Sequence, residues 1–163
     1  MNTISTHDGT TIAYDKAGEG PALIVVDGAL SVHSSGGKSE LAKLLAPHLT
    51  VYGYDRRGRG GSGDTLPYAV DREIEDLEAL IDDAGGSAFL YGHSSGASLA
   101  MLAAVKLGTK VTKLAMYEAP YNDEPDAQES WREYLRQLRI LECQTDDVNV
   151  GVLAPVLAEF FTS

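Results

Sequence analysis

Hydrophobic residues in the first 120 positions fall into short runs separated by Gly-rich or polar turns. Residues 22–26 read Ala-Leu-Ile-Val-Val without a polar break. Similar runs lie at residues 49–54, 88–91 and 111–117. Runs of this length are typical of strands buried on both faces of a sheet. Residues 10–15 instead alternate between the two faces, which predicts an edge or near-edge strand.

Helical spacing occurs between these runs. Across residues 71–84 the apolar positions share one face and acidic residues come early, where the helix dipole favours them. Residues 39–45 and 97–107 predict two further helices. Strands that alternate with helices predict an α/β fold, a doubly wound and mostly parallel sheet of about six or seven strands with helices on both faces.

The pattern changes after Pro120. Helical spacing is found around Trp131, and residues 153–161 predict a closing helix. We therefore predict a single domain over residues 1–163, with the core sheet in residues 1–120 and a shorter C-terminal segment in residues 121–163.

Composition narrows the class of protein. Hydrophobic residues make up 44% and charged residues 23%, as expected of a folded protein. The formal net charge of -11 disfavours nucleic acid and anionic membrane surfaces as partners. Cys143 is the only cysteine, so an internal disulfide is excluded and a cytoplasmic location is expected. Residues 1–5 do not resemble a signal peptide, and no apolar run is long enough to span a bilayer.

The most specific motif is G-x-S-x-G at residues 92–96, between an apolar run and a small-residue helix. A sharp turn there would expose the Ser94 hydroxyl at the end of a strand, as in a nucleophile elbow. Glycines on either side are expected because a Cβ would collide with the neighbouring strand and helix. Ser94 is therefore the candidate nucleophile.

Two further segments follow predicted strands in the same way. Residues 27–30 read Asp-Gly-Ala-Leu, and residues 55–62 read Asp-Arg-Arg-Gly-Arg-Gly-Gly-Ser. In this order and with these gaps, the three motifs resemble the N-terminal half of an α/β-hydrolase-fold enzyme. The resemblance covers roughly residues 10–120 and implies an esterase-like serine hydrolase.

The resemblance assigns roles to individual residues. Ser94 would be the nucleophile, and the backbone N–H groups of Ala29 and Ser95 would form the oxyanion hole. Glu118, at the end of the run over residues 111–117, would be the acid of the triad. A solvated or helix-capping carboxylate is an equally open interpretation of Glu118.

The histidine of such a triad would follow the acid in the chain. The four histidines of this sequence, His7, His33, His48 and His93, all precede Ser94.

Residues 143–148 are similar to the loop that carries this histidine, but Cys143 takes its glycine position and Asp146 its histidine position. That similarity implies a shortened member lacking the lid and the C-terminal histidine. An aspartate with a pKa of about 3.9 is a weak base at neutral pH.

Among the histidines that are present, His33 is the candidate substitute base because it follows the loop that carries Ala29. His93 is interpreted as a buried histidine held by the backbone. His48 is placed in a surface loop and His7 in the N-terminal arm.

Three functions stay open. The first is hydrolysis of a small ester or related carbonyl substrate, slowed by the missing histidine. The second is a catalytically inactive small-molecule binding or scaffold protein, and the third is a piece of a longer enzyme.

No cofactor or metal is expected, because the arginine-rich segment lacks the Lys-Ser/Thr ending of a P-loop and the histidines are scattered. We interpret that segment as a turn whose arginines pair with acids. A missing strand would favour a homodimer, or a swapped element, that covers the sheet edge.

Overall fold

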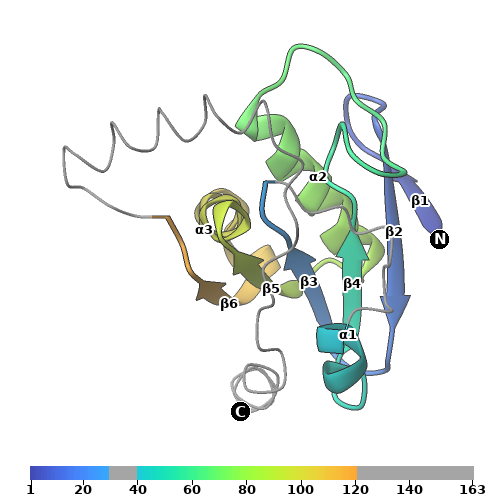
Figure 1. Cartoon of the computed structure of the whole chain (residues 1–163), viewed down its shortest axis with the longest axis vertical. Coiled ribbons are helices and arrows are strands. Elements are labelled where there is room, and N and C mark those ends of the chain that lie inside the picture. The colour runs from blue at the N-terminus through green and yellow to red at the C-terminus, as the bar shows by residue number, and fades with distance from the viewer. Residues whose placement is uncertain (30–39, 121–163) are drawn as a thin grey trace.

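The computed structural model describes residues 1–29 and 40–120 (Figure 1). The described strands are β1 (Asn2–Ser5), β2 (Thr11–Ala17), β3 (Ala22–Val26), β4 (Thr50–Tyr54), β5 (Ala88–His93) and β6 (Val111–Tyr117). The described helices are α1 (Glu40–Leu45), α2 (Val70–Asp83), α3 (Ser95–Leu107) and the short 3-10 helix η2 (Gly108–Lys110). The predictions made for His33 and for residues 121–163, Cys143 and Asp146 included, lie outside the described residues.

The strands form one sheet in the order β1-β2-β4-β3-β5-β6. Strands β4, β3, β5 and β6 run parallel, while β1 and β2 pair antiparallel at one edge. The prediction of a mostly parallel sheet is confirmed, and β2 lies second from the edge. The sequence analysis missed β1, because three of its four residues are exposed and the strand has no apolar run.

Helices cover both faces of this sheet, as predicted. On β3, Ile24 and Val26 face the core cluster that contains residues of α2 and α3. The intervening residues Leu23 and Val25 face the cluster that contains residues of α1. Because successive side chains of a strand point to opposite faces, a continuous apolar run fills both layers.

The parallel register aligns the ends of the central strands. Val25 pairs with Gly53 of β4 and with Tyr91 of β5, so the three strands end at the same edge of the sheet. The segments that follow them in the chain are residues 27–29, the loop from Asp55 to α2, and Ser94. This edge therefore brings together the three motifs that the sequence analysis singled out.

Candidate active site

Ser94 forms the turn between β5 and α3. Its φ of 54° and ψ of -126° lie in a region that side chains rarely adopt. The Ser94 N–H donates to the carbonyl of Tyr117 at 2.9 Å, and its own carbonyl accepts from the Ala97 N–H at 2.9 Å. Such a conformation costs about 1–3 kcal/mol and persists only where the surrounding structure imposes it.

The two glycines of the motif allow that turn to pack closely. A Cβ on Gly96 would lie 2.0 Å from the carbonyl oxygen of Val26, and one on Gly92 would lie 2.5 Å from the Cα of Ala97. Neither distance is compatible with a side chain, so the G-x-S-x-G pattern is required by the approach of α3 to β3 and β5.

The segment after β3 faces this serine. A Cβ on Gly28 would lie 3.5 Å from the Cβ of Ser94 and 3.9 Å from its Oγ. Ala29 follows and is exposed. On the other side, Ser95 is the first residue of α3, where N–H groups have no carbonyl four residues earlier to accept from them. The structure thus brings Ser94 and Ser95 close to the segment that carries Ala29.

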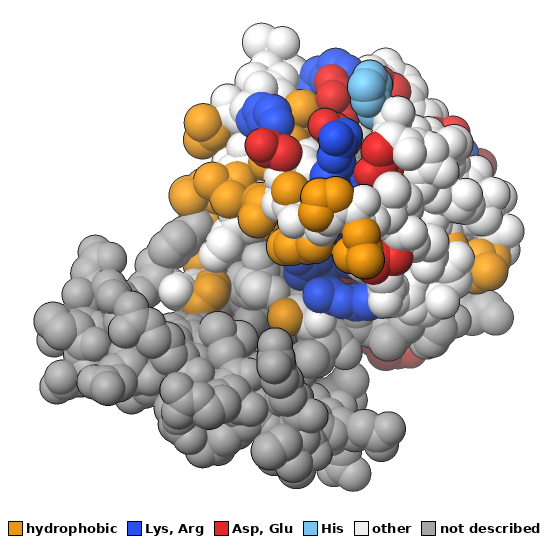
Figure 2. All heavy atoms as spheres, turned by 90° about the horizontal axis from the view of Figure 1, so that it is seen from above, with side chains coloured by type: hydrophobic (Ala, Val, Ile, Leu, Met, Phe, Trp, Pro, Cys, Tyr) orange, Lys and Arg blue, Asp and Glu red, His pale blue; other side chains and the backbone are white. Residues whose placement is uncertain are grey.

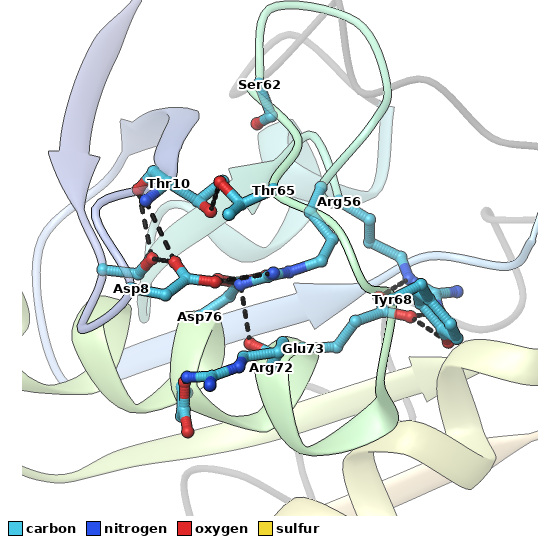
Figure 3. Close-up of polar contacts among 12 residues, drawn as sticks. Asp8, Thr10, Arg56, Ser62, Thr65, Tyr68, Arg72, Glu73 and Asp76 are labelled. Carbon is cyan, nitrogen blue, oxygen red and sulfur yellow. Dashed lines mark hydrogen bonds and ion pairs between the residues drawn. The ribbon is translucent and has the colours of Figure 1, made fainter.

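Arg56 connects the segment after β3 and the first residue of α3 to α2. Its Nε and Nη2 donate to the carboxylate of Glu73 at 2.5 and 2.7 Å. Its Nη1 donates to the carbonyl of Asp27 at 3.2 Å and to the Oγ of Ser95 at 3.4 Å. Figure 3 shows Glu73 between Arg56 and Tyr68, whose hydroxyl donates to Oε1 at 2.8 Å. Burial would raise the pKa of Glu73, but the hydrogen bonds and charge of Arg56 outweigh it and lower that pKa.

Arg57 is matched by acids as well. It donates to both carboxylate oxygens of Asp76, at 2.8 and 2.7 Å, and to Asp8 at 3.0 Å. The side chains of Arg57 and Asp76 are each 1% exposed. Burial raises the pKa of Asp76, although Arg57 opposes this shift. The prediction that arginines of this segment pair with nearby acids is confirmed for Arg56 and Arg57.

Arg59 differs from both. Its side chain is half-buried, and its Nη1 donates to the carbonyl of Gly28 at 3.3 Å. Within residues 1–29 and 40–120, no carboxylate lies within ion-pair distance of it. Burial, together with the charge of Arg56, lowers the pKa of Arg59. Sequence reasoning treated the arginines as one set, and only the pairing in three dimensions separates Arg59 from the others.

The turn that carries Arg59 is fixed by its glycines. The Arg59 N–H donates to the carbonyl of Arg56 at 3.1 Å, and the Gly61 N–H donates to Asp55 at 2.8 Å. Gly60 has a φ of 52°, and a Cβ there would lie 2.2 Å from Oδ2 of Asp55. The glycine-rich sequence therefore fixes where the Arg59 backbone sits relative to β4.

Glu118 and His93 form a pair that the sequence analysis did not anticipate. Glu118 follows β6 with a φ of 51°, and its side chain is 64% exposed. Its Oε2 lies 3.6 Å from Nε2 of His93. The interpretation of His93 as a buried histidine held by the backbone is wrong: it is half-buried at the strand end, where the pairing of His93 with Tyr117 places it beside Glu118.

A base for Ser94 is not found among the described residues. Of the histidines there, His7, His48 and His93, none forms a hydrogen bond with the Ser94 side chain. In the same part of the chain, no group of three or more His, Cys, Asp or Glu could hold a metal ion. No helix in residues 1–29 or 40–120 combines the length and the apolar character needed to cross a membrane.

The surface near the site mixes apolar and cationic side chains. Figure 2 views the molecule from the top of Figure 1 and shows hydrophobic side chains exposed beside Lys and Arg side chains. The exposed hydrophobic residues just before and at the start of α2 are Leu66, Tyr68 and Val70. A hollow of about 260 Å³ lies elsewhere, at the opposite ends of the strands, and is lined by residues such as Gly20, Ala88 and Thr112.

A mostly parallel sheet covered on both faces, with a serine on a strained turn between a strand and a helix, defines an α/β-hydrolase fold. Residues 30–161 match the model of the alpha/beta hydrolase family, and the chain belongs to this family. The fold predicted from the sequence is thereby confirmed.

Known relatives agree with this assignment. The chain is 52% identical to an alpha/beta hydrolase from Sphaerobacter thermophilus, with a TM-score of 0.70, over 85% of this chain and 55% of that one. It is 34% identical to N-formylmaleamate deformylase of Pseudomonas putida KT2440 over 63% of this chain and 39% of the relative. N-formylmaleamic acid deformylase of Pseudomonas putida S16 is 26% identical, with a TM-score of 0.66, over 83% of this chain and 55% of that one. The chain thus spans about half the length of these structures, and less of the curated relative.

Proposed function

We propose that Ser94 is the nucleophile of an acyl hydrolase that acts on small carbonyl substrates, with the backbone N–H groups of Ser95 and Ala29 as oxyanion donors. One observation carries the proposal: Ser94 occupies a strained turn at the start of α3 and faces Gly28. A serine held in this way presents its hydroxyl beside amide donors that no helix bond uses.

The chemistry follows from these positions. The Oγ of Ser94 attacks the substrate carbonyl carbon and its proton passes to a base. The carbonyl oxygen becomes an oxyanion, which accepts hydrogen bonds from the two amides. The intermediate then expels the leaving group, which takes up the proton, and water releases the acyl group from the serine. Losing one oxyanion donor typically raises the barrier by about 3–4 kcal/mol.

The two deformylases suggest the kind of bond. Their names describe removal of a formyl group from N-formylmaleamic acid. We extend this to the present chain as hydrolysis of a small ester or N-acyl amide. Glu118 remains the proposed acid, although it faces His93, and His33 remains the proposed base. Without a base, the oxyanion hole and binding leave a residual acceleration of about 10³–10⁴ over water.

A catalytically inactive small-molecule binding protein is the second candidate. It is favoured by the absence, in the described part of the chain, of a histidine bonded to Ser94. In that case the turn would bind a carbonyl or carboxylate oxygen without attacking it.

Hydrolysis of 4-nitrophenyl acetate separates the two candidates. We expect turnover above the buffer rate in the wild type, and a rate at least about tenfold lower in Ser94→Ala, where only the oxyanion donors and binding remain. Ser87→Ala is the matched control, because this exposed serine lies before β5, at the opposite end of the strand. Turnover that is undiminished in Ser94→Ala contradicts the proposal, and a folded wild type with no turnover supports the binding protein.

A further inference from the structure

The three arginines of the loop after β4 differ in how their charge is matched. Arg56 is paired with Glu73, and Arg57 with Asp76 and Asp8. Arg59 has no such partner among the described residues. A guanidinium has five N–H donors, and the described residues accept only one bond from this one, at the carbonyl of Gly28.

Glu73 forms its hydrogen bonds with other residues, and none with Arg59. Both of its oxygens accept from Arg56, and Oε1 also accepts from the Tyr68 hydroxyl. Burial disfavours the charged form of Arg59, and the positive charge of Arg56 adds to this effect. Arginine nevertheless stays protonated in proteins. The charge of Glu73 opposes this shift only in part, so Arg59 is a half-buried cation with no direct ion pair among the described residues.

Its position links it to Ser94. The Gly28 residue whose carbonyl accepts from Arg59 is the same residue whose Cα faces Ser94, where a Cβ would lie 3.9 Å from the serine Oγ. The guanidinium and the hydroxyl thus flank one residue. A small molecule whose carbonyl is at Ser94 and which extends past Gly28 would therefore reach Arg59.

We propose that Arg59 binds a carboxylate of the substrate, so that the molecules hydrolysed at Ser94 are small acyl compounds that carry a carboxylate. This inference rests on the proposed function and adds its substrate class. The planar fork of a guanidinium binds a carboxylate through two parallel N–H···O bonds. With a net charge of -11, the protein as a whole repels anions, so an anion would be held by a local cation such as Arg59, which has no ion-pair partner among the described residues.

The surroundings suit a small acid with a short carbon skeleton. The hydrophobic side chains of Leu66 and Tyr68 are exposed on the loop that also carries Arg59. Figure 2 shows hydrophobic and cationic side chains next to each other on the face seen from the top of Figure 1. One unpaired guanidinium matches a single negative charge, which favours a carboxylate over a phosphate dianion.

Two esters with the same leaving group test this proposal. 4-Nitrophenyl acetate is neutral, and the mono-4-nitrophenyl ester of succinic acid carries a carboxylate. We expect Arg59→Gln to lower kcat/KM for the succinate ester about 10- to 100-fold, mainly through KM, as expected for loss of a charged hydrogen-bond partner. For the acetate ester the change should stay below about threefold.

Two further variants separate binding from structure. Arg59→Lys keeps the charge and should restore part of the succinate preference. Arg72→Gln removes a positive charge from the exposed face of α2, where it pairs with Glu75, and should leave both esters unchanged. Equal losses on both esters in Arg59→Gln overturn the proposal, because they indicate that Arg59 only supports Gly28. Competition by inorganic phosphate that is stronger than competition by succinate also overturns it.

A binding measurement makes the result independent of turnover. Calorimetric titration of Ser94→Ala with succinate should give binding that is lost when Arg59→Gln is added and that weakens with added salt. If Ser94 proves to be inert, this titration still decides the role of Arg59. If the single and double variants bind succinate with equal affinity, or if neither binds it, the proposed role of Arg59 is wrong. Neither outcome bears on the proposed role of Ser94.

Discussion

The two ends of the parallel strands differ in what they hold. At the carboxyl end lie a serine with positive φ and the arginines with their buried acids. At the amino end lies a hollow of about 260 Å³ whose lining includes no charged side chain. Within the described residues, a hollow thus lies at the amino end, and a strained serine with buried ion pairs lies at the carboxyl end.

This difference indicates that the functional site lies at the carboxyl end of the strands. The hollow is lined by uncharged residues such as Thr50, Ser87 and Phe89, and its lining holds no His, Asp or Glu that could act as a general acid or base. Strain at Ser94 costs stability, as does a half-buried guanidinium at Arg59 that has no ion-pair partner in residues 1–29 and 40–120, and such costs concentrate at functional sites. Substitutions at the two ends should therefore have different effects on stability and on activity.

The largest contrast should come from the buried ion pair. Arg57→Gln leaves Asp76 charged and buried without its partner, and we expect it to lower the free energy of unfolding by about 3–5 kcal/mol. The control at the amino end is Thr50→Val, which removes an exposed hydrogen bond to Gly20 and should cost at most about 1 kcal/mol. Urea denaturation measures both. Equal losses would contradict the view that the carboxyl end is held by buried charge.

Glycine substitutions sharpen the same comparison. Gly96→Ala places a Cβ 2.0 Å from the carbonyl of Val26 and should cost at least about 3 kcal/mol. At the amino end, Gly85 has a φ of 107°, and a Cβ there would meet no atom within 4 Å, so Gly85→Ala should cost only about 1–2 kcal/mol of backbone strain. Thermal denaturation of the two variants shows which of them loses more stability. A Gly96→Ala protein as stable as Gly85→Ala would show that α3 does not press against β3.

Strain at Ser94 predicts an opposition between stability and activity. Ser94→Gly relieves a positive φ and should raise the free energy of unfolding by about 1 kcal/mol while removing the hydroxyl. Ser87 has no positive φ, and Ser87→Gly should cost up to about 1 kcal/mol through the entropy of the unfolded chain. Loss of stability in Ser94→Gly would argue that the turn is unstrained.

The smallest effect concerns pH. Hydrogen bonds from Thr10, and the one from Arg57, hold the pKa of Asp8 below its usual value. The unfolded chain therefore binds this proton more readily than the folded chain, and stability falls as pH is lowered through the ordinary range of an aspartate, about 4. In Asp8→Asn this part of the acid dependence should vanish. An unchanged slope of unfolding free energy against pH would show that the pKa of Asp8 is not lowered in the folded protein.

Much of the sheet could be predicted because its strands have a recognisable local sequence pattern. The apolar runs of β3 and β4 fill both core layers, and the glycines around Ser94 mark a close approach. What escaped prediction depends on distant partners. β1 exists by pairing with β2, and the contact of His93 with Glu118 depends on the register of β5 and β6. Arg59 differs from Arg56 and Arg57 because Glu73 and Asp76 of α2 lie within reach of those two side chains, and no described carboxylate forms an ion pair with Arg59.

The most direct test of the central claim is to treat the folded protein with a fluorophosphonate probe and to map the adduct by peptide mass spectrometry. Because Ser94 has a positive φ at the start of α3 and faces Gly28, we expect a single adduct on Ser94, absent in Ser94→Ala and retained in Ser87→Ala. An adduct on another residue, or none on a folded sample, would contradict the assignment of Ser94 as the nucleophile.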